Sequence, residues 1–380
     1  MERIYVDHAA TSPMHPKVID KMMEVMNTEF GNPSSIHSFG RGARHIIDEA
    51  RAEMAQSIGA QANEIIFTSG GTEADNHAIF GIAQAYQHKG KHIITTKIEH
   101  HAVFHTCEQL EKEGFDVTYL PVDQEGRISL IDLKHALRDD TILVTIMYGN
   151  NEVGTIQPIK EIGEIIASHQ AIFHTDAVQA YGLEKINVKE SSIDLMSVSA
   201  HKINGPKGIG FLYVNKDVTL SSRLFGGEQE RKRRAGTENV PSIAGFLEAV
   251  RILQQEMEAK REKYEQFKSS FIKKLIENKV DFTQNGSLDF SLPHILNLSF
   301  PGTNVEAMLV NLDLAGIAAS SGSACTAGSI DPSHVLVAMF GKDDERIQNS
   351  IRFSFGLTNT LEQIEVVAEE TSKIVKRLTT

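Results

Sequence analysis

Two charged residues stand at the ends of predicted buried strands and could act together in amine chemistry. Asp176 ends the apolar run at residues 171–176, and Lys202 follows the run at residues 193–200. Charged side chains at the carboxyl ends of strands in an open α/β sheet lie where ligands bind. A lysine can form a Schiff base with an aldehyde and an aspartate can keep a pyridine nitrogen protonated, so the pair suits pyridoxal phosphate. A plain ion pair is the alternative.

A phosphate site is suggested by the segment TSGGTEADN at residues 68–76, which runs from a predicted strand into a helix. Gly71 lets the backbone approach an anion, and Thr72 adds a hydroxyl beside the free amides of the helix N-terminus. Glu73 and Asp75 are expected to face the positive end of the helix dipole. The alternative is a plain helix start with Thr72 as its cap.

The two cysteines lie in contrasting surroundings. Cys325 lies among small residues at 319–329, a composition that predicts an exposed, mobile loop rather than a core. An accessible thiol on such a loop suits nucleophilic attack and group transfer, although an incidental loop cysteine is the alternative. Cys107 lies within a helical pattern and is interpreted as structural.

A histidine pair follows the predicted strand at residues 92–96. The imidazoles of His100 and His101 could stack on a cofactor ring and move protons, or could simply begin a helix. Together with His105 they could also suggest a metal. No carboxylate or thiol occurs at matching spacing, so no metal site is expected.

Arginines occur at two places that could bind an anion. Arg352 lies inside the predicted strand at residues 351–355, where a substrate carboxylate or a structural salt bridge could pair with it. The cluster RKRR at residues 231–234 could contact a nucleic acid or another anion, but residue type favours a solvated loop face.

Composition narrows the class of protein. The chain has 380 residues, a formal net charge of −12 and two cysteines, which argues against a general nucleic-acid binder, a disulfide scaffold and a thiolate zinc site. The first residues have neither the basic nor the apolar region of a signal peptide, and no apolar run of about 18 residues predicts a membrane span. A soluble protein of the reducing cytoplasm is expected.

The order of the elements predicts an α/β fold. Strands alternate with helices at residues 74–88 and 158–169, which favours a mostly parallel sheet covered on both faces. One or two long helices are expected over residues 241–278, followed by a smaller α+β part. We expect a large domain over residues 13–255 and a small domain over residues 1–12 and 256–380. The predicted strands cover residues 64–69, 92–96, 116–121, 141–147, 171–176, 193–200, 209–214, 294–300 and 351–355.

Eight ordered motifs identify a family resemblance over nearly the whole chain. The sequence resembles the cysteine desulfurases of the NifS/IscS type, within the class-V aminotransferase-like, fold-type I pyridoxal-phosphate enzymes. These enzymes have a mostly parallel seven-stranded sheet and a smaller C-terminal domain. The motifs are GNPSSIH, FTSGGTEADN, IEHHAV, GNNEVG, HTDAVQ, SAHKINGPKGIG, RRAGTEN and SSGSACTAGSIDPSHVL.

The resemblance implies a role for each matching residue. Lys202 would form the Schiff base, Asp176 would pair with the ring nitrogen, and Gln179 would bond the ring hydroxyl. His100 would stack on the ring and assist proton transfer, and Cys325 would accept the sulfur. The phosphate would be held by Gly71, Thr72, Ser199 and His201 with Thr237 of a partner subunit, and the substrate by Asn151 and Arg352.

The resemblance also implies a reaction and partners. Cysteine would become alanine while Cys325 keeps a persulfide, within a homodimer whose subunits share sites. The loop at about residues 319–333 resembles that of the subgroup with a long mobile loop, which would carry the persulfide to an acceptor protein. The chain ends at residues 377–380, without the further segment with which iron–sulfur assembly members dock their scaffold, so tRNA thiolation stays open beside cluster assembly. A selenocysteine lyase, an aminotransferase and a non-enzymatic sulfur-relay or scaffold protein are the alternatives.

Overall fold

The computed structural model describes residues 3–322, 325, 326, 329, 330 and 332–380. Its centre is a seven-stranded sheet with the order β2-β8-β7-β6-β5-β3-β4, in which β8 alone runs antiparallel to its neighbours. The predicted, mostly parallel α/β sheet is therefore confirmed. Its strands are β2 (Ile65–Thr68), β3 (His92–Thr96), β4 (Asp116–Leu120), β5 (Thr141–Thr145), β6 (Ile172–Asp176), β7 (Leu195–Ser199) and β8 (Gly210–Val214).

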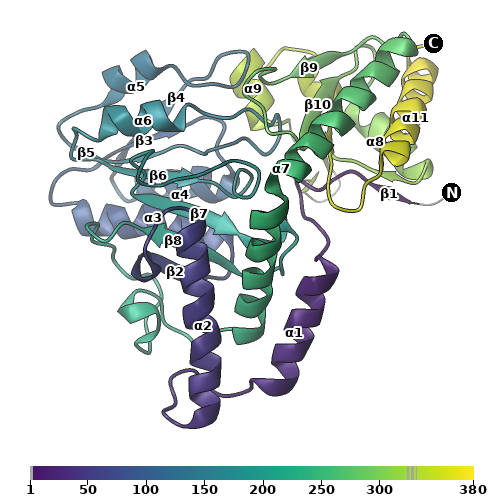
Figure 1. The fold of residues 1–380 in the computed structure, drawn as a ribbon. Coiled ribbons are helices and arrows are strands. Elements are labelled where there is room, and N and C mark those ends of the chain that lie inside the picture. The colour runs from purple at the N-terminus through teal and green to yellow at the C-terminus, as the bar shows by residue number, and fades with distance from the viewer. Residues whose placement is uncertain (1–2, 323–324, 327–328, 331) are drawn as a thin grey trace.

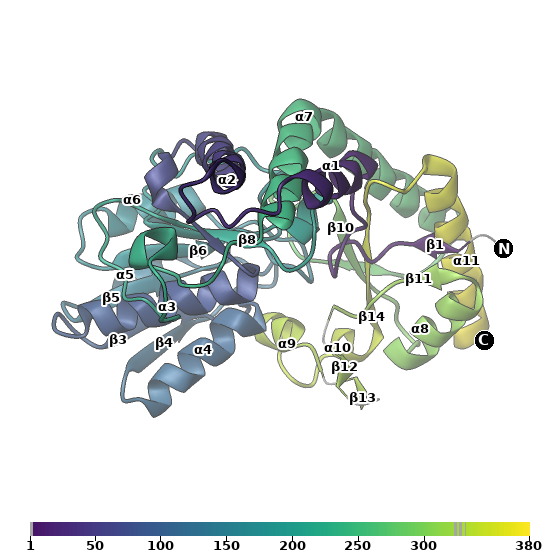
Figure 2. The same ribbon diagram turned by 90° about the horizontal axis from the view of Figure 1, so that it is seen from below.

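Helices cover both faces of this sheet (Figures 1 and 2). Alternate residues of each strand point to opposite faces, so Ile66 packs under one helical layer and Phe67 under the other. The layer over Ile66 contains α3 (Gly71–Tyr86) and α4 (His101–Lys112). The opposite layer contains α1 (Pro16–Thr28), α2 (Ser38–Ser57), α5 (Leu130–Ala136), α6 (Ile159–Ile166) and the first half of α7 (Val240–Glu277).

A second core lies beside the first and is built on a three-stranded antiparallel sheet with the order β14-β10-β9. The N-terminal strand β1 (Ile4–Tyr5) pairs in parallel with β11 (Ile317–Ala318), so the start of the chain joins this part. The remaining elements are β9 (Thr283–Asn285), β10 (Ile295–Ser299), β12 (Cys325–Thr326), β13 (Ser329–Ile330), β14 (Ser350–Ser354), α8 (Val305–Leu314), α9 (His334–Phe340), α10 (Arg346–Asn349) and α11 (Leu361–Thr379).

One helix connects the two cores. The predicted helical stretch at residues 241–278 forms the single 38-residue helix α7, which is about 57 Å long at the usual rise per residue. Its N-terminal half, with Phe246 and Leu253, packs in the first core, and its C-terminal half, with Phe267 and Phe271, packs in the second. We therefore propose that the boundary between the two predicted domains lies within α7. Among the described residues, no helix is both long and apolar enough to cross a membrane.

Candidate active site

The carboxyl ends of the parallel strands meet at one edge of the sheet and bring polar side chains into one cavity. Asp176 is the last residue of β6, and Ser199 is the last residue of β7. The 3-10 turn Ala200–Ile203 that follows β7 carries His201 and Lys202. The cavity has a volume of about 360 Å³. It brings together the predicted residues Gly71, Thr72, His100, Asn151, Asp176, Gln179, Ser199, His201, Lys202 and Arg352.

The helix start of α3 forms one wall of the cavity. Gly70 precedes the helix with φ +144°, and a Cβ on Gly71 would lie only 2.8 Å from Val178 Cγ2, so both positions favour glycine. The first amides of this 16-residue helix are free of helical partners and carry its positive dipole end. Glu73 accepts a hydrogen bond from the Ser69 amide at 2.8 Å, as expected for a carboxylate at this end.

Asp176 and Lys202 lie in the same buried environment. Burial raises the pKa of the acid and lowers the pKa of the amine, so it favours the neutral form of both. Asp176 is 6% exposed and accepts a hydrogen bond from the Val178 amide at 2.9 Å. Burial raises the pKa of Asp176 to about 6, against the Val178 bond and the Lys202 charge. Burial, together with the Arg352 guanidinium, lowers the pKa of Lys202 to about 7. The Lys202 amine donates to the carbonyls of Ala9 and Ala10.

If pyridoxal phosphate binds here, as the family resemblance implies, the titration of Lys202 should be visible when the apoprotein takes up the cofactor, because only the neutral amine attacks an aldehyde. With a pKa of about 7, the neutral fraction rises roughly fivefold from pH 6 to 7 and less than twofold from pH 7 to 8. We expect the rate at which the visible band appears, measured by stopped-flow absorbance, to follow this curve. A rate that kept rising tenfold per unit up to pH 10 would indicate an unperturbed lysine.

His100 and Gln179 line the cavity from different elements. His100 is the N-cap of α4, where its Nδ1 accepts a hydrogen bond from the Ala102 amide at 3.1 Å. Its ring opens on the cavity, yet the surrounding protein and the Lys202 charge lower the pKa of His100 to about 4. Gln179 is buried and donates to the Ala9 carbonyl at 2.9 Å. His100 is therefore neutral, and its Nδ1 already accepts a hydrogen bond. Such a ring is better suited to stack on an aromatic ligand than to form an ion pair.

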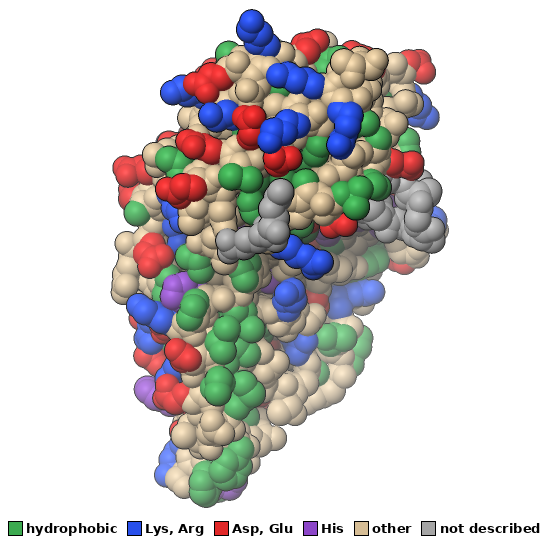
Figure 3. Space-filling view, turned by 90° about the vertical axis from the view of Figure 1, so that its right-hand side faces the viewer, with side chains coloured by type: hydrophobic (Ala, Val, Ile, Leu, Met, Phe, Trp, Pro, Cys, Tyr) green, Lys and Arg blue, Asp and Glu red, His purple; other side chains and the backbone are tan. Residues whose placement is uncertain are grey.

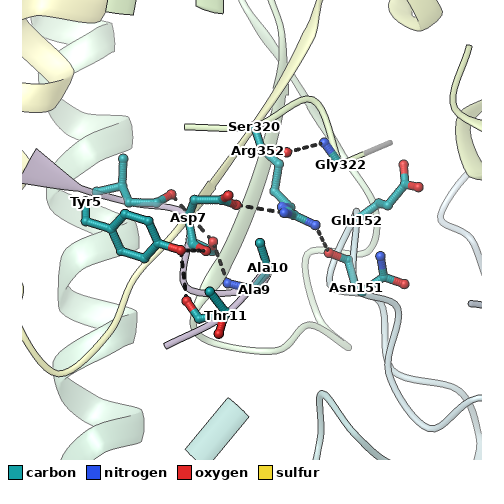
Figure 4. A network of polar contacts seen from close by, with 12 residues as sticks. Tyr5, Asp7, Ala9, Ala10, Thr11, Asn151, Glu152, Ser320, Gly322 and Arg352 are labelled. Carbon is teal, nitrogen blue, oxygen red and sulfur yellow. Dashed lines mark hydrogen bonds and ion pairs between the residues drawn. The ribbon is translucent and has the colours of Figure 1, made fainter. Parts of the chain in front are cut away.

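Arg352 is held between two segments that are far apart in the sequence (Figure 4). It is 4% exposed; one terminal nitrogen donates to Asp7 at 2.8 Å and the other to the Asn151 carbonyl at 2.8 Å. The structural salt bridge that the sequence left as an alternative is thus present, with Asp7 as the partner. Asp7 could not be identified as this partner from local sequence patterns, because 345 residues separate it from Arg352.

Both described ends of the segment that carries Cys325 are attached at this cavity. The backbone of Ser320 exchanges two hydrogen bonds with Arg352, at 2.6 and 3.2 Å. At the other end, the Ser333 hydroxyl donates to the buried carboxyl of Glu152 at 2.5 Å. Cys325 belongs to the short strand β12, and its side chain lies outside the described residues. Residues 323, 324, 327, 328 and 331 of the expected mobile loop at residues 319–333 also lie outside the described residues, so its mobility stays a prediction.

The remaining sequence expectations have different outcomes. Cys107 is fully buried in α4, so its structural assignment is confirmed. Thr237 is exposed and does not line the cavity of its own chain. The expected solvated face of the RKRR cluster holds for Arg231 and Lys232, which are exposed, but is wrong for the two arginines that follow. They are half-buried: Arg233 donates to the Asn63 carbonyl at 2.9 Å, and Arg234 pairs with Glu73 at 2.8 Å.

Comparison with known proteins places this site in a family. The family model described as "Aminotransferase class-V" matches residues 4–367. The chain belongs to the class-V aminotransferase family. Among curated relatives, "Putative cysteine desulfurase IscS 1" of Bacillus subtilis (strain 168) is 64% identical, over 100% of both chains. "Cysteine desulfurase IscS" of Methanosarcina thermophila is 50% identical, over 99% of this chain and 92% of the relative.

Solved structures of this family have the same fold. A "NIFS-LIKE PROTEIN" superposes with a TM-score of 0.92 at 35% identity, over 99% of this chain and 100% of the other. The structure titled "SspA in complex with cysteine" superposes with a TM-score of 0.81 at 37% identity, over 93% of this chain and 98% of the other. The predicted resemblance to NifS/IscS-type proteins is thus confirmed over the full length.

Enzymes of this family use pyridoxal phosphate, and the residues of the cavity fit that cofactor. A primary amine with a lowered pKa is present in Lys202, and a buried carboxylate without an arginine partner among the described residues is present in Asp176. The free amides of α3 and the hydroxyls of Thr72 and Ser199 offer donors for a phosphate on the same wall. These groups match the aldehyde, the ring nitrogen and the phosphate of the cofactor.

Proposed function

We propose that this enzyme is a cysteine desulfurase, which converts L-cysteine to L-alanine and keeps the sulfur as a persulfide on Cys325. The observation that carries the proposal is the meeting of Lys202, Asp176 and Arg352 in one cavity whose border holds both ends of the Cys325 segment. The relatives named cysteine desulfurase, at 46–64% identity over 99–100% of this chain, support it.

The chain's residues divide the reaction between them. Bound pyridoxal phosphate withdraws electrons from the α-carbon of the substrate amino acid. Arg352, with Asn151 beside it, binds the substrate carboxylate. Lys202, whose pKa of about 7 leaves much of it neutral, accepts the α-proton. When the cofactor is bound, Asp176 would pair with its ring nitrogen, Gln179 would bond the ring hydroxyl, and His100 would stack on the ring.

The sulfur step requires a thiolate from Cys325. The thiolate forms an S–S bond with the substrate sulfur while the carbon–sulfur bond breaks. The electron pair of that bond stays on the substrate, which takes up a proton and leaves as alanine. Cys325 then holds the sulfur as a persulfide for transfer to an acceptor. An aminotransferase or a selenocysteine lyase would share the cavity but would not need this transfer.

The proposal is tested with cysteine labelled on sulfur. The holoenzyme should release one alanine for each sulfur bound, and the label should remain on the protein until a thiol is added. Candidate acceptors for tRNA thiolation and for iron–sulfur cluster assembly are then added separately, and the acceptor that gains label is the physiological type. Release of pyruvate or of a keto acid in place of alanine would contradict the proposed reaction.

We further propose a homodimer that forms through the face around α1 and the start of α2. Figure 3 shows hydrophobic side chains gathered over the lower half of this face. Such a patch on a single chain marks an interface. Thr237, exposed and away from its own cavity, would reach the phosphate of the partner chain. The exposed side chains are Met14, Ile19, Met23, Met26, Phe30, Ile36 and Phe39.

Charged residues on this face should therefore separate the subunits. The double substitution Met23→Glu and Met26→Glu places two carboxylates in the proposed interface, since each side chain is 55% exposed in the single chain. We expect sedimentation velocity to show a monomer with weakened cofactor binding. Ile131→Glu is the matched control, because Ile131 is 65% exposed on α5, away from this face. A double variant that stayed dimeric would place the interface elsewhere.

A further inference from the structure

A second carboxyl group is buried beside Asp176 and has no role in the mechanism above. Asp75 lies in the second turn of α3 and is 1% exposed. One of its oxygens has no hydrogen-bond partner among the described atoms. One oxygen of Asp75, one of Asp176 and a ring nitrogen of His100 lie within 4.8 Å of one another. The carboxyl group of Asp75 is therefore a close buried neighbour of the Asp176 carboxyl, and Asp75 also lines the cavity.

Among the described residues, no lysine or arginine forms an ion pair with Asp75. The basic group that lies close to it is His174, whose Nε2 is 3.7 Å from the Asp75 oxygen. The His174 ring is already bonded to Thr145 at 2.8 Å and to Ser197 at 3.0 Å. Complete burial lowers the pKa of His174 to about 3, so this ring is neutral. A charged Asp75 would therefore be buried without a counter-ion, which is strongly unfavourable.

The other charged groups that face Asp75 make ionisation still less favourable. Burial raises the pKa of Asp75 well above its ordinary value, and the carboxylates of Asp176 and Glu99 raise it further, against a hydrogen bond from Ser197. Burial also raises the pKa of Glu99 to about 8. Lys202 lowers the pKa of Asp176, so Asp176 is the member of this group that keeps the negative charge.

We propose that Asp75 is a positioning residue for Asp176: it is an uncharged acid that donates its proton in a hydrogen bond to the Asp176 carboxylate. This arrangement keeps one negative charge, on Asp176, where the proposed function needs it to face the ring nitrogen of the cofactor. The inference rests on that function. The sequence had suggested a different role for Asp75, as a partner of the helix dipole, and its burial in the second turn argues against it.

Two substitutions separate the charge of Asp75 from its hydrogen bond. Asp75→Asn keeps a neutral donor of the same shape, and Asp75→Leu keeps the size but removes the donor. The readouts are the dissociation constant for pyridoxal phosphate and the pH titration of the visible absorption band. We expect Asn to leave both unchanged. We expect the leucine variant to bind pyridoxal phosphate about tenfold more weakly. We also expect the midpoint of its visible-band titration to shift by about one pH unit, because the Asp176 carboxylate loses a hydrogen-bond donor.

The matched control is Asp194→Asn. Asp194 precedes β7 at the opposite end of the same sheet, and its carboxylate accepts a hydrogen bond from the Phe173 amide at 2.9 Å. This variant removes a carboxyl from the sheet without reaching the cavity. Because the leucine variant could fail to fold, the wild-type protein gives a second measurement. The infrared difference between wild type and Asp75→Asn should contain the carbonyl stretch of a protonated acid.

Each outcome decides the proposal. If Asp75→Asn shifts the titration by one unit or more, Asp75 was ionised, since a full charge this close has at least that effect at an effective dielectric constant of about 20. The proposed hydrogen bond from Asp75 to Asp176 does not exist if the visible band of Asp75→Leu titrates as in the wild type. The same conclusion follows if the infrared difference shows only a carboxylate. If the wild-type protein shows no visible band with added cofactor, the proposed function itself is wrong, and this result is independent of the role of Asp75.

Discussion

Replacing Cys325 with alanine is expected to abolish persulfide formation and to reduce alanine release from cysteine by about a thousandfold or more, while the visible spectrum of the bound cofactor stays the same. The thiolate of Cys325 is the only group proposed to receive the substrate sulfur, and without it the carbon–sulfur bond has no nucleophile to break it. The measurement is alanine released per enzyme together with sulfur label retained on the protein.

The chain provides its own control for this experiment. Cys107→Ala removes the other thiol, which is fully buried in α4 and whose pKa is raised by that burial. We expect this variant to keep its activity and to lose only a little stability, since a small buried side chain is shortened. Alanine release that survived the loss of Cys325 would favour a lyase, whereas an aminotransferase would release a keto acid from cysteine with or without Cys325.

Replacing Lys202 with alanine should have a comparably large effect, but at an earlier step. The variant would have no amine for the cofactor aldehyde and no base for the α-proton, so turnover should fall by about 10³-fold or more. The visible band of the lysine-bound cofactor should be absent, and gel filtration should remove the cofactor. Absorbance and alanine release from the same preparation test both expectations.

Lys207→Ala is the matched control for Lys202. Lys207 lies five residues further along the same segment, is exposed, and does not line the cavity. Its loss should change neither the spectrum nor the turnover. If Lys202→Ala kept a cofactor that gel filtration could not remove, together with measurable turnover, another amine would hold the aldehyde.

Much of the fold and of the cavity could be predicted because both depend on local patterns. The buried strands are short runs of β-branched residues, and the structure places their ends within one or two residues of the expected positions. Asp176 is the last residue of β6, and Lys202 lies three residues after the end of the adjacent parallel strand β7, so the rule that ligands bind at carboxyl ends was sufficient to bring them together. Gly71, at the start of α3, comes shortly after the carboxyl end of β2, so the same rule places it at this edge of the sheet.

Contacts between distant segments could not be predicted in this way. Asp7 pairs with Arg352, and Glu73 pairs with Arg234, although the local sequence around each carboxylate gives no sign of its partner. The burial of Asp75 also depends on tertiary packing, because a helix start rich in acidic residues is expected to face solvent. The environment of Cys325 lies outside the described residues, so its proposed role rests on the reaction and on the family.

The continuous course of α7 has a consequence for how the protein unfolds. The same helix buries Phe246 in one core and Phe271 in the other. Unfolding of either core would therefore free half of α7, and the other half would lose the support of a continuous helix. The two predicted domains should therefore denature as one cooperative unit, with a single calorimetric peak. Fragments cut within α7 should not fold on their own.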